Sequence, residues 1–497
     1  MGETEKYQGL TRYNRLSKNI ILSLFAKVLP LFIGLFAIPV LISALGEARF
    51  GVLALIWVVI SYLSMFNLGM SPALVRLISD KIAKQEYTEI NKVVWTGVIF
   101  ISIMGIFAGL VSLGLSKWLV YTVFEIENEL KEEAYKALVY TSYTIPFIIS
   151  ASGFRAVMES LQKFNAISFI QGINSFLNYL LPLVIVLYLK NSIEWVVLGL
   201  LAVKILVFIF LMVMALNTET SLKKGIHFEL GYLKEMIGFG KWVTVSSILG
   251  PLMAQLDRYF IGAFLSVKAV TFYSAPLEVL SKTMIIPSAV VAVLFPAFST
   301  LSESSVSRRD KLFLQSNRAV LILLFPILLI VSATAPFGIK AWLGESFVAQ
   351  STFVAHVFCI IYFIRGGSYV PASFLHGVNR PDLTAKFHLL EVVLFILALK
   401  YVSGFGTINH IALVALGITA IDTLLLIWGV LSQIENKKEY FTNIVIPMGI
   451  GALLISLPLF VSGDRLIITV IVSIALLLVI NFSFIRKLLN KSLSVES

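Results

Sequence analysis

Residues 193–216 read IEWVVLGLLAVKILVFIFLMVMAL, and the charged side chains among them are Glu194 and Lys204. An α-helix rises about 1.5 Å per residue, so about 20 residues cross the roughly 30 Å hydrocarbon core of a bilayer. This run is long enough and apolar enough for one crossing. The sequence therefore predicts a transmembrane helix here.

The same pattern recurs along the whole chain of 497 residues, of which 58% are hydrophobic and 13% are charged. Soluble domains have about 25% charged residues. Open sheet edges cannot lie in lipid, so each run is expected to be a helix. We therefore predict an all-α polytopic membrane protein with about fourteen transmembrane helices. The predicted spans are residues 19–45, 50–70, 93–115, 135–157, 166–188, 193–216, 237–264, 269–297, 314–338, 351–375, 384–402, 409–431, 441–461 and 465–486.

Basic side chains gather in alternate connections between these spans. Lys6 and Arg12 precede the first span and Lys223 and Lys224 follow the sixth, whereas the connection after the third span is acidic. Cytoplasmic loops are enriched in lysine and arginine. The alternation predicts a multi-pass protein of the inner or plasma membrane with both termini cytoplasmic. Because these loops account for the net charge of +11, no nucleic-acid partner is predicted.

The longest predicted inner connection, residues 217–236, divides the chain near its middle. We expect an N-terminal lobe of six spans over residues 1–216 and a C-terminal lobe of six spans over residues 237–432. Two additional spans follow in residues 433–497. The connection at 217–236 is interpreted as the hinge between the lobes.

Several cations fall inside the predicted spans, where a charged side chain costs about 2.5–3.5 kcal/mol to insert. Such residues usually face a water-filled cavity or a partner. Lys27 and Arg365 have no acid three or four residues away, and Arg258 adjoins Asp257 on a diverging helix face. A cavity containing these cations would suit an anionic head group such as a diphosphate. The candidate substrate-binding cations are Lys27, Arg258, Lys282 and Arg365.

Acids also fall inside the predicted spans. Glu278 lies four residues before Lys282, the favoured order for a helical ion pair, so these two side chains could instead neutralise each other. The others could take part in ion or proton coupling, or they could be buried, hydrogen-bonded acids. The candidates for coupling to an H⁺ or Na⁺ gradient are Asp257, Glu278, Glu391 and Asp422.

The fifth predicted span has a polar stripe, in which Gln171, Asn174 and Asn178 recur at helical spacing. Such a stripe can line a cavity or join helices through hydrogen bonds. Lys204, on the next span, has no partner that can be identified from the sequence.

Sequence signatures of catalysis are missing. The chain contains no GxxxxGK[ST], HExxH, CxxC or GxSxG, and its five histidines have no close metal-ligand spacing. Its single cysteine, Cys359, cannot form a disulfide within the chain. We therefore predict a protein that is not an enzyme and that has no cofactor and no metal site.

Five short motifs occur in a fixed order along the chain. LGEARFGVLAL at 45–55 is similar to LGxxxYGxxAL, with Phe50 in place of tyrosine, and QLDRYFIG at 255–262 is similar to QxDRxxxG. FYSA at 272–275, FPAFS at 295–299 and GVNRP at 377–381 complete the set. In this order they resemble the oligosaccharide-repeat flippases of polysaccharide biosynthesis (Wzx-type). That family belongs to the MOP (multidrug/oligosaccharidyl-lipid/polysaccharide) superfamily, with the multidrug exporters and the lipid II flippases.

The resemblance implies two six-helix lobes around a central cavity, with the last two spans outside them. It also implies alternating access and an undecaprenyl-diphosphate-linked oligosaccharide as substrate, for O-antigen and lipopolysaccharide, capsule or exopolysaccharide synthesis. Membrane lipids, a polysaccharide polymerase and a chain-length regulator are the expected partners. Two alternatives stay open: a cation-coupled small-molecule antiporter of the multidrug-export type, and a membrane glycosyltransferase or polymerase. The excess of intramembrane cations disfavours the first, and the short outer loops disfavour the second.

Overall fold

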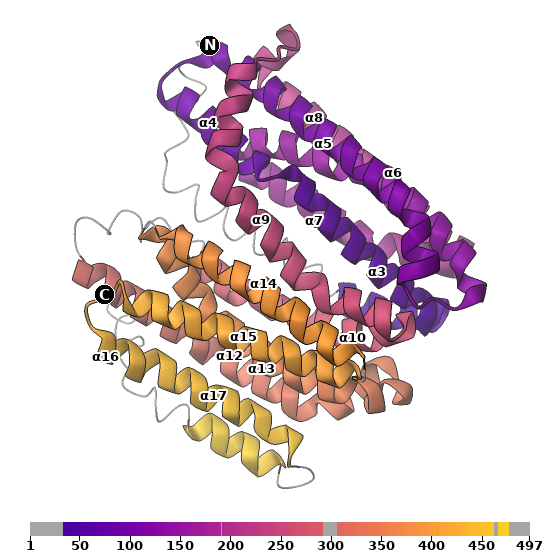
Figure 1. Ribbon diagram of the computed structural model, residues 1–497, viewed down its shortest axis with the longest axis vertical. Coiled ribbons are helices and arrows are strands. Elements are labelled where there is room, and N and C mark those ends of the chain that lie inside the picture. Colours follow the sequence, from indigo (N-terminus) through magenta and orange to yellow (C-terminus); the bar gives the residue numbers. More distant parts are fainter. Residues whose placement is uncertain are drawn as a thin grey trace, which may run out of the picture. The chain divides into compact units, whose positions relative to one another are not determined.

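The computed structural model describes residues 33–189, 191–291, 306–378, 380–404, 406–461 and 466–476. Within these ranges the backbone forms helices joined by turns, and no strand occurs (Figure 1). Many large apolar side chains on the helices are exposed, and Phe107 and Leu110 on one helix are 51% and 62% accessible. Such exposure is normal where the surrounding solvent is lipid. The prediction of an all-α membrane protein agrees with this structure.

The chain divides into two compact units, of which one ends at Ser274 and the other begins at Ala275. The division falls inside α10 (Val267–Leu280). The first unit extends past residue 216 because α9 (Leu230–Phe264) packs on α3 and α4. The predicted lobe boundary at 217–236 stays a prediction.

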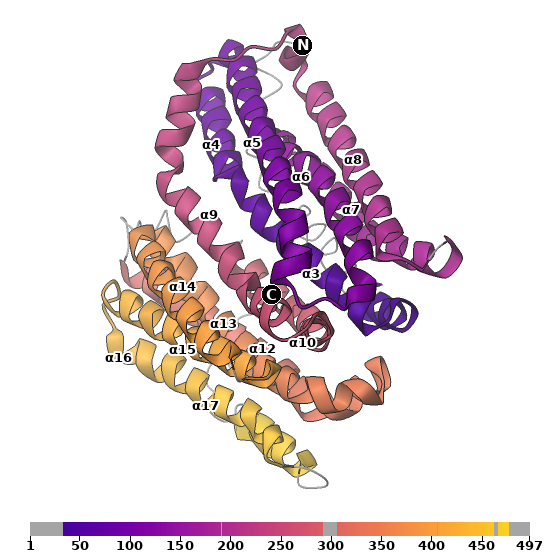
Figure 2. The ribbon, with the colours of Figure 1, turned by 45° about the vertical axis from the view of Figure 1, so that its right-hand side comes forward.

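The first unit consists of long helices that run side by side (Figure 2). Its α-helices after the apolar helix Ile33–Leu45 are α3 (Glu47–Ser64), α4 (Met70–Ala83), α5 (Ile90–Trp118), α6 (Lys131–Ser160), α7 (Phe164–Val184), α8 (Ile193–Thr218), α9 and the first part of α10. Short 3-10 turns are η1 (Met65–Asn67), η2 (Tyr87–Glu89), η4 (Asn128–Leu130) and η6 (Thr220–Lys224), and π-helical turns are η3 (Leu119–Val123) and η5 (Ile185–Leu189).

Close packing of α5 on α6 depends on small residues. A Cβ atom on Gly109 would lie 2.9 Å from the carbonyl oxygen of Ser142 and 3.0 Å from Cγ of Pro146. The Ser142 hydroxyl donates a hydrogen bond to the Ser112 hydroxyl at 2.7 Å. Because lipid gives helices no hydrophobic reason to associate, close backbone approach and hydrogen bonds between helices hold such pairs together.

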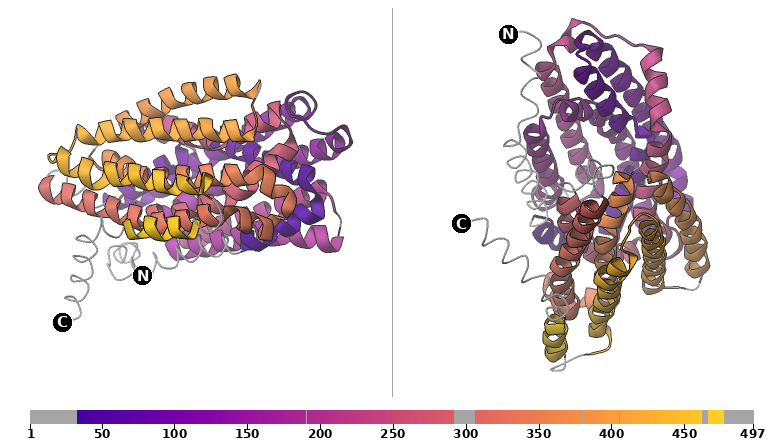
Figure 3. Two further views of the ribbon diagram at one scale, coloured as in Figure 1. Left: turned by 90° about the horizontal axis from the view of Figure 1, so that it is seen from below. Right: turned by 90° about the vertical axis from the view of Figure 1, so that its left-hand side faces the viewer.

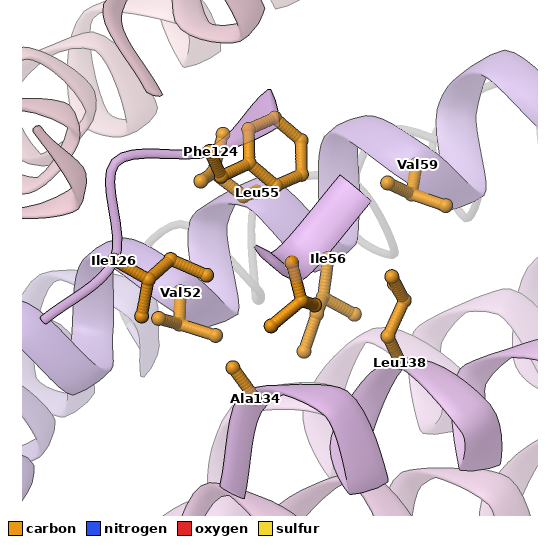
Figure 4. Close-up of a pocket in the computed structure, with 9 residues that line it drawn as sticks. Val52, Leu55, Ile56, Val59, Phe124, Ile126, Ala134 and Leu138 are labelled. Atoms are coloured by element: carbon orange, nitrogen blue, oxygen red, sulfur yellow. The ribbon is translucent and has the colours of Figure 1, made fainter. Parts of the chain in front are cut away.

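A small apolar pocket lies where α3 meets the beginning of α6. Figure 4 shows Val52 and Ile56 from α3 facing Ala134 and Leu138 from α6 across it. Its volume of about 10 Å³ leaves room for about one water molecule at most, and apolar side chains line it. The pocket is therefore a packing void and not a ligand site.

The inter-lobe segment is fixed to the beginning of α5. Asn91 is 7% exposed, and its amide donates hydrogen bonds to the carbonyl oxygens of Ser221 at 2.6 Å and Gly225 at 3.2 Å. Its Oδ1 lies 2.9 Å from Nδ1 of His227, and the Trp95 indole donates to the carbonyl of Leu222 at 3.2 Å. The predicted hinge is thus tied down at its first half by side chains of one helix.

Replacing Asn91 with alanine should release this segment. Three hydrogen bonds would be lost and the carbonyls of the segment left unsatisfied, at about 1–3 kcal/mol for a buried polar group. Trypsin should then cleave after Lys223 and Lys224 about tenfold faster in the purified protein, because local opening governs proteolysis. Ser79→Ala is the control, because the exposed Ser79 hydroxyl bonds only within its own helix. Equal cleavage rates in both variants would contradict the expectation.

The second unit is a bundle around α13, which contacts α12, α15, α14 and α17 (Figure 3). Its elements after the end of α10 are η7 (Ser281–Met284), α12 (Val306–Leu343), α13 (Glu345–Gly377), α14 (Pro381–Ser403), α15 (Ile408–Leu431), α16 (Lys437–Tyr440), the π-helical turn η8 (Phe441–Val445), α17 (Ile446–Ser456) and η9 (Leu457–Leu459), with a short apolar helix at Leu466–Leu476. The buried Ser332 hydroxyl lies 2.9 Å from Nδ1 of His356 and donates to the carbonyl of Ile455 at 3.0 Å. These contacts join α12, α13 and α17.

Eight helices in the described ranges are long and apolar enough to cross a membrane, and each coincides with a predicted span. They are Tyr87–Val123, Asn128–Ser160, Asn165–Leu189, Ile193–Thr218, Val306–Leu343, Glu345–Gly377, Ile408–Leu431 and Lys437–Leu459.

Six predicted spans lie outside this set. Spans 50–70, 237–264 and 384–402 overlap helices α3, α9 and α14. In α14, for example, Asp382, Lys386, Glu391 and Lys400 interrupt the apolar run. Spans 19–45, 269–297 and 465–486 lie partly outside the described residues. The total of fourteen stays a prediction.

Candidate functional site

The predicted substrate-binding cations fall in different parts of the structure. Arg258 lies on α9 in the first unit, and Lys282 and Arg365 lie in the second unit, on η7 and α13. Lys27 is outside the described residues. The prediction that these cations line one cavity stays a prediction.

Asp257 and Arg258 are both buried, at 6% and 5% exposure. Asp257 accepts a hydrogen bond from the fully buried Tyr273 hydroxyl at 2.7 Å through Oδ2, and from the backbone N–H of Arg258 at 2.8 Å through Oδ1. The carboxylate therefore joins α9 to α10. Tyr62 on α3 also lies within electrostatic range of both charged groups. This cluster connects three helices inside the first unit.

The polar stripe of α7 binds the lysine of α8. Lys204 Nζ donates hydrogen bonds to Oδ1 of Asn174 at 2.8 Å and to Oδ1 of Asn178 at 2.9 Å. The structure thus supplies the partners of Lys204 that the sequence did not. With its amide oxygen turned toward the guanidinium of Arg155, Gln171 accepts a hydrogen bond at 3.0 Å. The stripe joins helices within the first unit, and its role in lining a cavity stays a prediction.

Glu278 and Lys282 form the ion pair that their spacing indicated. Lys282 Nζ lies 3.7 Å from Oε2 of Glu278. The Lys282 side chain is 31% exposed and the Glu278 side chain is 16% exposed. The pair partly neutralises the charge of Lys282.

A second polar cluster lies between α14 and α15, which pack side by side in the second unit (Figure 2). His388 Nδ1 lies 3.1 Å from Oε2 of Glu391, three residues further along α14. One ligand atom from each of His388, Glu391 and Asp422 lies within 4.8 Å of the others. Asp422 is on α15. The structure therefore brings together two of the four predicted coupling acids and adds a histidine.

The carboxyl oxygens of this cluster are short of hydrogen-bond donors. Glu391 is 0% exposed, and its Oε1 has no hydrogen-bond partner among the described residues. The same holds for Oδ1 of the half-buried Asp422. One oxygen of each carboxyl group nevertheless lies within 4.8 Å of an oxygen of the other. Buried carboxyl oxygens without a donor are costly, and a proton or a cation between them removes that cost.

Neighbouring helices add charge and polarity around the cluster. The guanidinium of Arg365 on α13 acts electrostatically on Asp422, and His376 at the end of α13 acts on His388. The Ser368 hydroxyl of α13 lies 2.9 Å from the Thr423 hydroxyl next to Asp422. Sequence reasoning overlooked His388, although its position three residues before Glu391 is visible as a helical spacing.

The chain is similar to proteins of polysaccharide biosynthesis. A family model described as polysaccharide biosynthesis protein matches residues 40–352. A putative O-antigen transporter of Shigella flexneri is 27% identical over 419 residues, which cover 83% of this chain and 96% of that protein. The lipopolysaccharide biosynthesis protein WzxC of Escherichia coli is 23% identical over 228 residues, which cover 45% and 46% of the two chains.

Solved structures share the fold. The lipid II flippase MurJ in an inward closed conformation superposes with a TM-score of 0.68 at 16% identity, covering 94% of this chain and 99% of that one. A multidrug resistance MATE family transporter of the MOP superfamily, in an inward-facing conformation, gives 0.67 at 11% identity, covering 89% and 100%. At these identities the likeness concerns the fold alone.

Proposed function

The chain belongs to the family of polysaccharide biosynthesis proteins, and we propose that it is a flippase for a lipid-linked oligosaccharide. It moves an undecaprenyl-diphosphate-linked repeat unit from the cytoplasmic to the outer leaflet by alternating access, for O-antigen, capsule or exopolysaccharide synthesis. The observation on which this rests is the family match over residues 40–352, supported by the similarity to nearly the full length of a putative O-antigen transporter.

The physical task explains why such a protein is needed. A diphosphate and its sugars would have to leave water to cross the hydrocarbon, at a prohibitive desolvation cost without a polar path. The lipid tail has no such cost and stays in the bilayer. A transporter with polar and cationic side chains at membrane depth supplies the path, and no chemical bond has to be made or broken.

The proposed architecture has about fourteen spans, with two six-helix lobes around a central cavity, two outer C-terminal spans and both termini in the cytoplasm. The chain is a multi-pass membrane protein, and we place it in the inner or plasma membrane. Lys27, Arg258, Lys282 and Arg365 hold the diphosphate and the nearest sugars. A polymerase and a chain-length regulator receive the flipped unit.

Transport against a gradient of substrate needs a source of free energy, and the chain has no ATP-binding signature. We propose coupling to an H⁺ or Na⁺ gradient. The described acids at membrane depth, Asp257, Glu278, Glu391 and Asp422, are the groups that can bind such an ion.

The runner-up function is a cation-coupled small-molecule antiporter, which the fold shared with a multidrug resistance transporter keeps open. A pocket for cationic drugs needs acids and aromatic faces in excess of cations. The predicted spans of this chain instead contain more cations than acids, which favours the flippase.

A deletion strain tests the proposal. Lipid-linked repeat units should accumulate on the cytoplasmic leaflet and surface polymer should disappear, because synthesis continues while flipping stops. Wild-type gene supplied on a plasmid should restore the polymer. If polymer export is unchanged while efflux of cationic drugs falls, the flippase proposal fails and the antiporter takes its place.

A further inference from the structure

We propose that His388, Glu391 and Asp422 form a proton-binding site between α14 and α15. The binding of the proton stands on the geometry of the second unit alone. Its use to drive transport rests on the proposed function.

The side chains of His388, Glu391 and Asp422 meet between α14 and α15. His388 and Glu391 lie on adjacent turns of α14 and share a contact of 3.1 Å between Nδ1 and Oε2. Asp422 approaches them from α15, so that one ligand atom of each residue lies within 4.8 Å of the other two. Two carboxyl groups from different helices thus face each other beside a histidine.

The carboxyl oxygens of Glu391 and Asp422 lack hydrogen-bond donors. Oε1 of the fully buried Glu391 and Oδ1 of Asp422 have no hydrogen-bond partner in the described part of the chain. An ionised carboxylate only accepts hydrogen bonds, so two ionised carboxylates cannot satisfy each other. One added proton converts one of them into a donor, and the pair then shares a hydrogen bond.

The charges of the two carboxylates and of Arg365 do not cancel without an added proton. Two ionised carboxylates beside the guanidinium of Arg365 leave one negative charge in excess before any proton is placed on the three side chains of the cluster. Each uncompensated charge at membrane depth is costly. One proton brings the sum to zero. Like-charged carboxyl groups in contact typically bind a first proton much more tightly than a second.

The geometry favours a proton over a metal ion. Nδ1 of His388 and Oε2 of Glu391 lie 3.1 Å apart, a separation that a proton shared between them fits. Hard cations need about six oxygen ligands, whereas this cluster offers two carboxyl groups. A second cation would also lie close to Arg365.

The site has a route for the proton. Glu391 has no exposed surface, but the His388 side chain is 34% exposed and touches it. Histidine exchanges protons near neutral pH and commonly relays them. His388 therefore connects the buried carboxyl pair to the surface of the protein.

Loss of the proton would weaken the attachment of α14 to α15, because two adjacent carboxylates repel each other. A proton that binds one arrangement of these helices more tightly than another shifts the population between them. Under the proposed function, this difference couples the proton gradient to the transport cycle.

Infrared difference spectra of the purified full-length protein in lipid nanodiscs, recorded between acidic and alkaline buffers, test the site. Wild-type protein should show a titrating carbonyl band of a protonated carboxylic acid. E391Q and D422N should each lose this band, and H388Q should shift its midpoint. D382N is the matched control, because Asp382 lies on α14 but is about one-third exposed and paired with Arg380 at 3.0 Å. It should leave the band unchanged.

Three results would overturn the proposal: a band that survives in either E391Q or D422N, a wild-type protein without such a band, or a band whose intensity changes with sodium concentration and not with pH. Because amide replacements keep the shape of the side chain, they preserve packing. If E391Q fails to fold, D422N decides. A titrating band in a protein whose deletion leaves polymer export intact would keep the proton site and refute the flippase. A protein that has no titrating band, but whose deletion abolishes polymer export, would keep the flippase and refute the proton site.

Discussion

Replacing Gly51 with alanine should leave little folded protein in the membrane. A Cβ atom at this position of α3 would overlap the carbonyl oxygen of Val267 and lie 2.6 Å from its carbonyl carbon, where α10 begins. These neighbours are backbone atoms, so they cannot rotate away. Overpacking a close contact costs about 1–3 kcal/mol and sometimes more. Because the helices themselves must separate here, we expect a cost at or above the upper end.

Two other glycines provide graded controls. A Cβ on Gly262 of α9 would lie 2.7 Å from a terminal methyl group of Leu55, which can move to another rotamer. Gly114 of α5 has nothing within 4 Å of the added atom. The yield of monodisperse protein and its thermal unfolding temperature, measured on fluorescent fusions, should fall severely for Gly51→Ala, moderately for Gly262→Ala and hardly at all for Gly114→Ala. Equal values for Gly51→Ala and Gly114→Ala would refute the packing argument.

The comparison of these glycines shows what a motif does and does not predict. Gly51 and Gly262 both belong to motifs that indicated the family from the sequence. The motifs could not predict which of the two alanine substitutions is more destabilising. That depends on whether backbone atoms or a flexible side chain lie opposite the glycine. That information depends on which helix packs against which.

Transmembrane helices were predictable where the apolar run is unbroken. Residues 193–216 coincide with α8 almost to the residue, because length and apolarity alone define such a helix. Charged helices such as α14 were placed correctly, but they are less apolar, so their role as spans depends on neighbours that compensate Glu391 and Lys400. The count of fourteen is therefore harder to establish than the helical fold.

The site was predictable only in its local contacts. The pair Glu278–Lys282 follows from i,i+4 spacing and is present at 3.7 Å. Lys204 finds its partners Asn174 and Asn178 on another helix, and Asp422 meets Glu391 across two helices. Both polar groups were noticed in the sequence, but no periodicity reveals which helices are neighbours.

Replacing Arg365 with alanine should abolish export of the glycan while leaving the protein in the membrane. Under the proposed function this guanidinium binds the diphosphate, and a hydrogen bond to a charged group contributes about 1.5–3 kcal/mol. Such a loss corresponds to a roughly 10- to 150-fold weaker binding of the substrate. Arg365→Lys keeps the charge but not the planar fork of donors, so it should retain part of the activity. Surface polymer and membrane-inserted protein are measured together in the complemented deletion strain.

Arg258→Ala, in the other unit, separates substrate binding from the proton site. Arg365 acts on Asp422, so its loss alone could disturb that cluster, whereas Arg258 lies on α9 beside Asp257. If both cations bind the diphosphate, both alanine variants should lose export and both purified proteins should bind undecaprenyl diphosphate more weakly than wild type. Arg308→Ala, at an exposed position near the start of α12, should behave as wild type. Normal export in both Arg258→Ala and Arg365→Ala would rule out these arginines as the groups that hold the substrate, because neither loss could then have removed a contact on which transport depends.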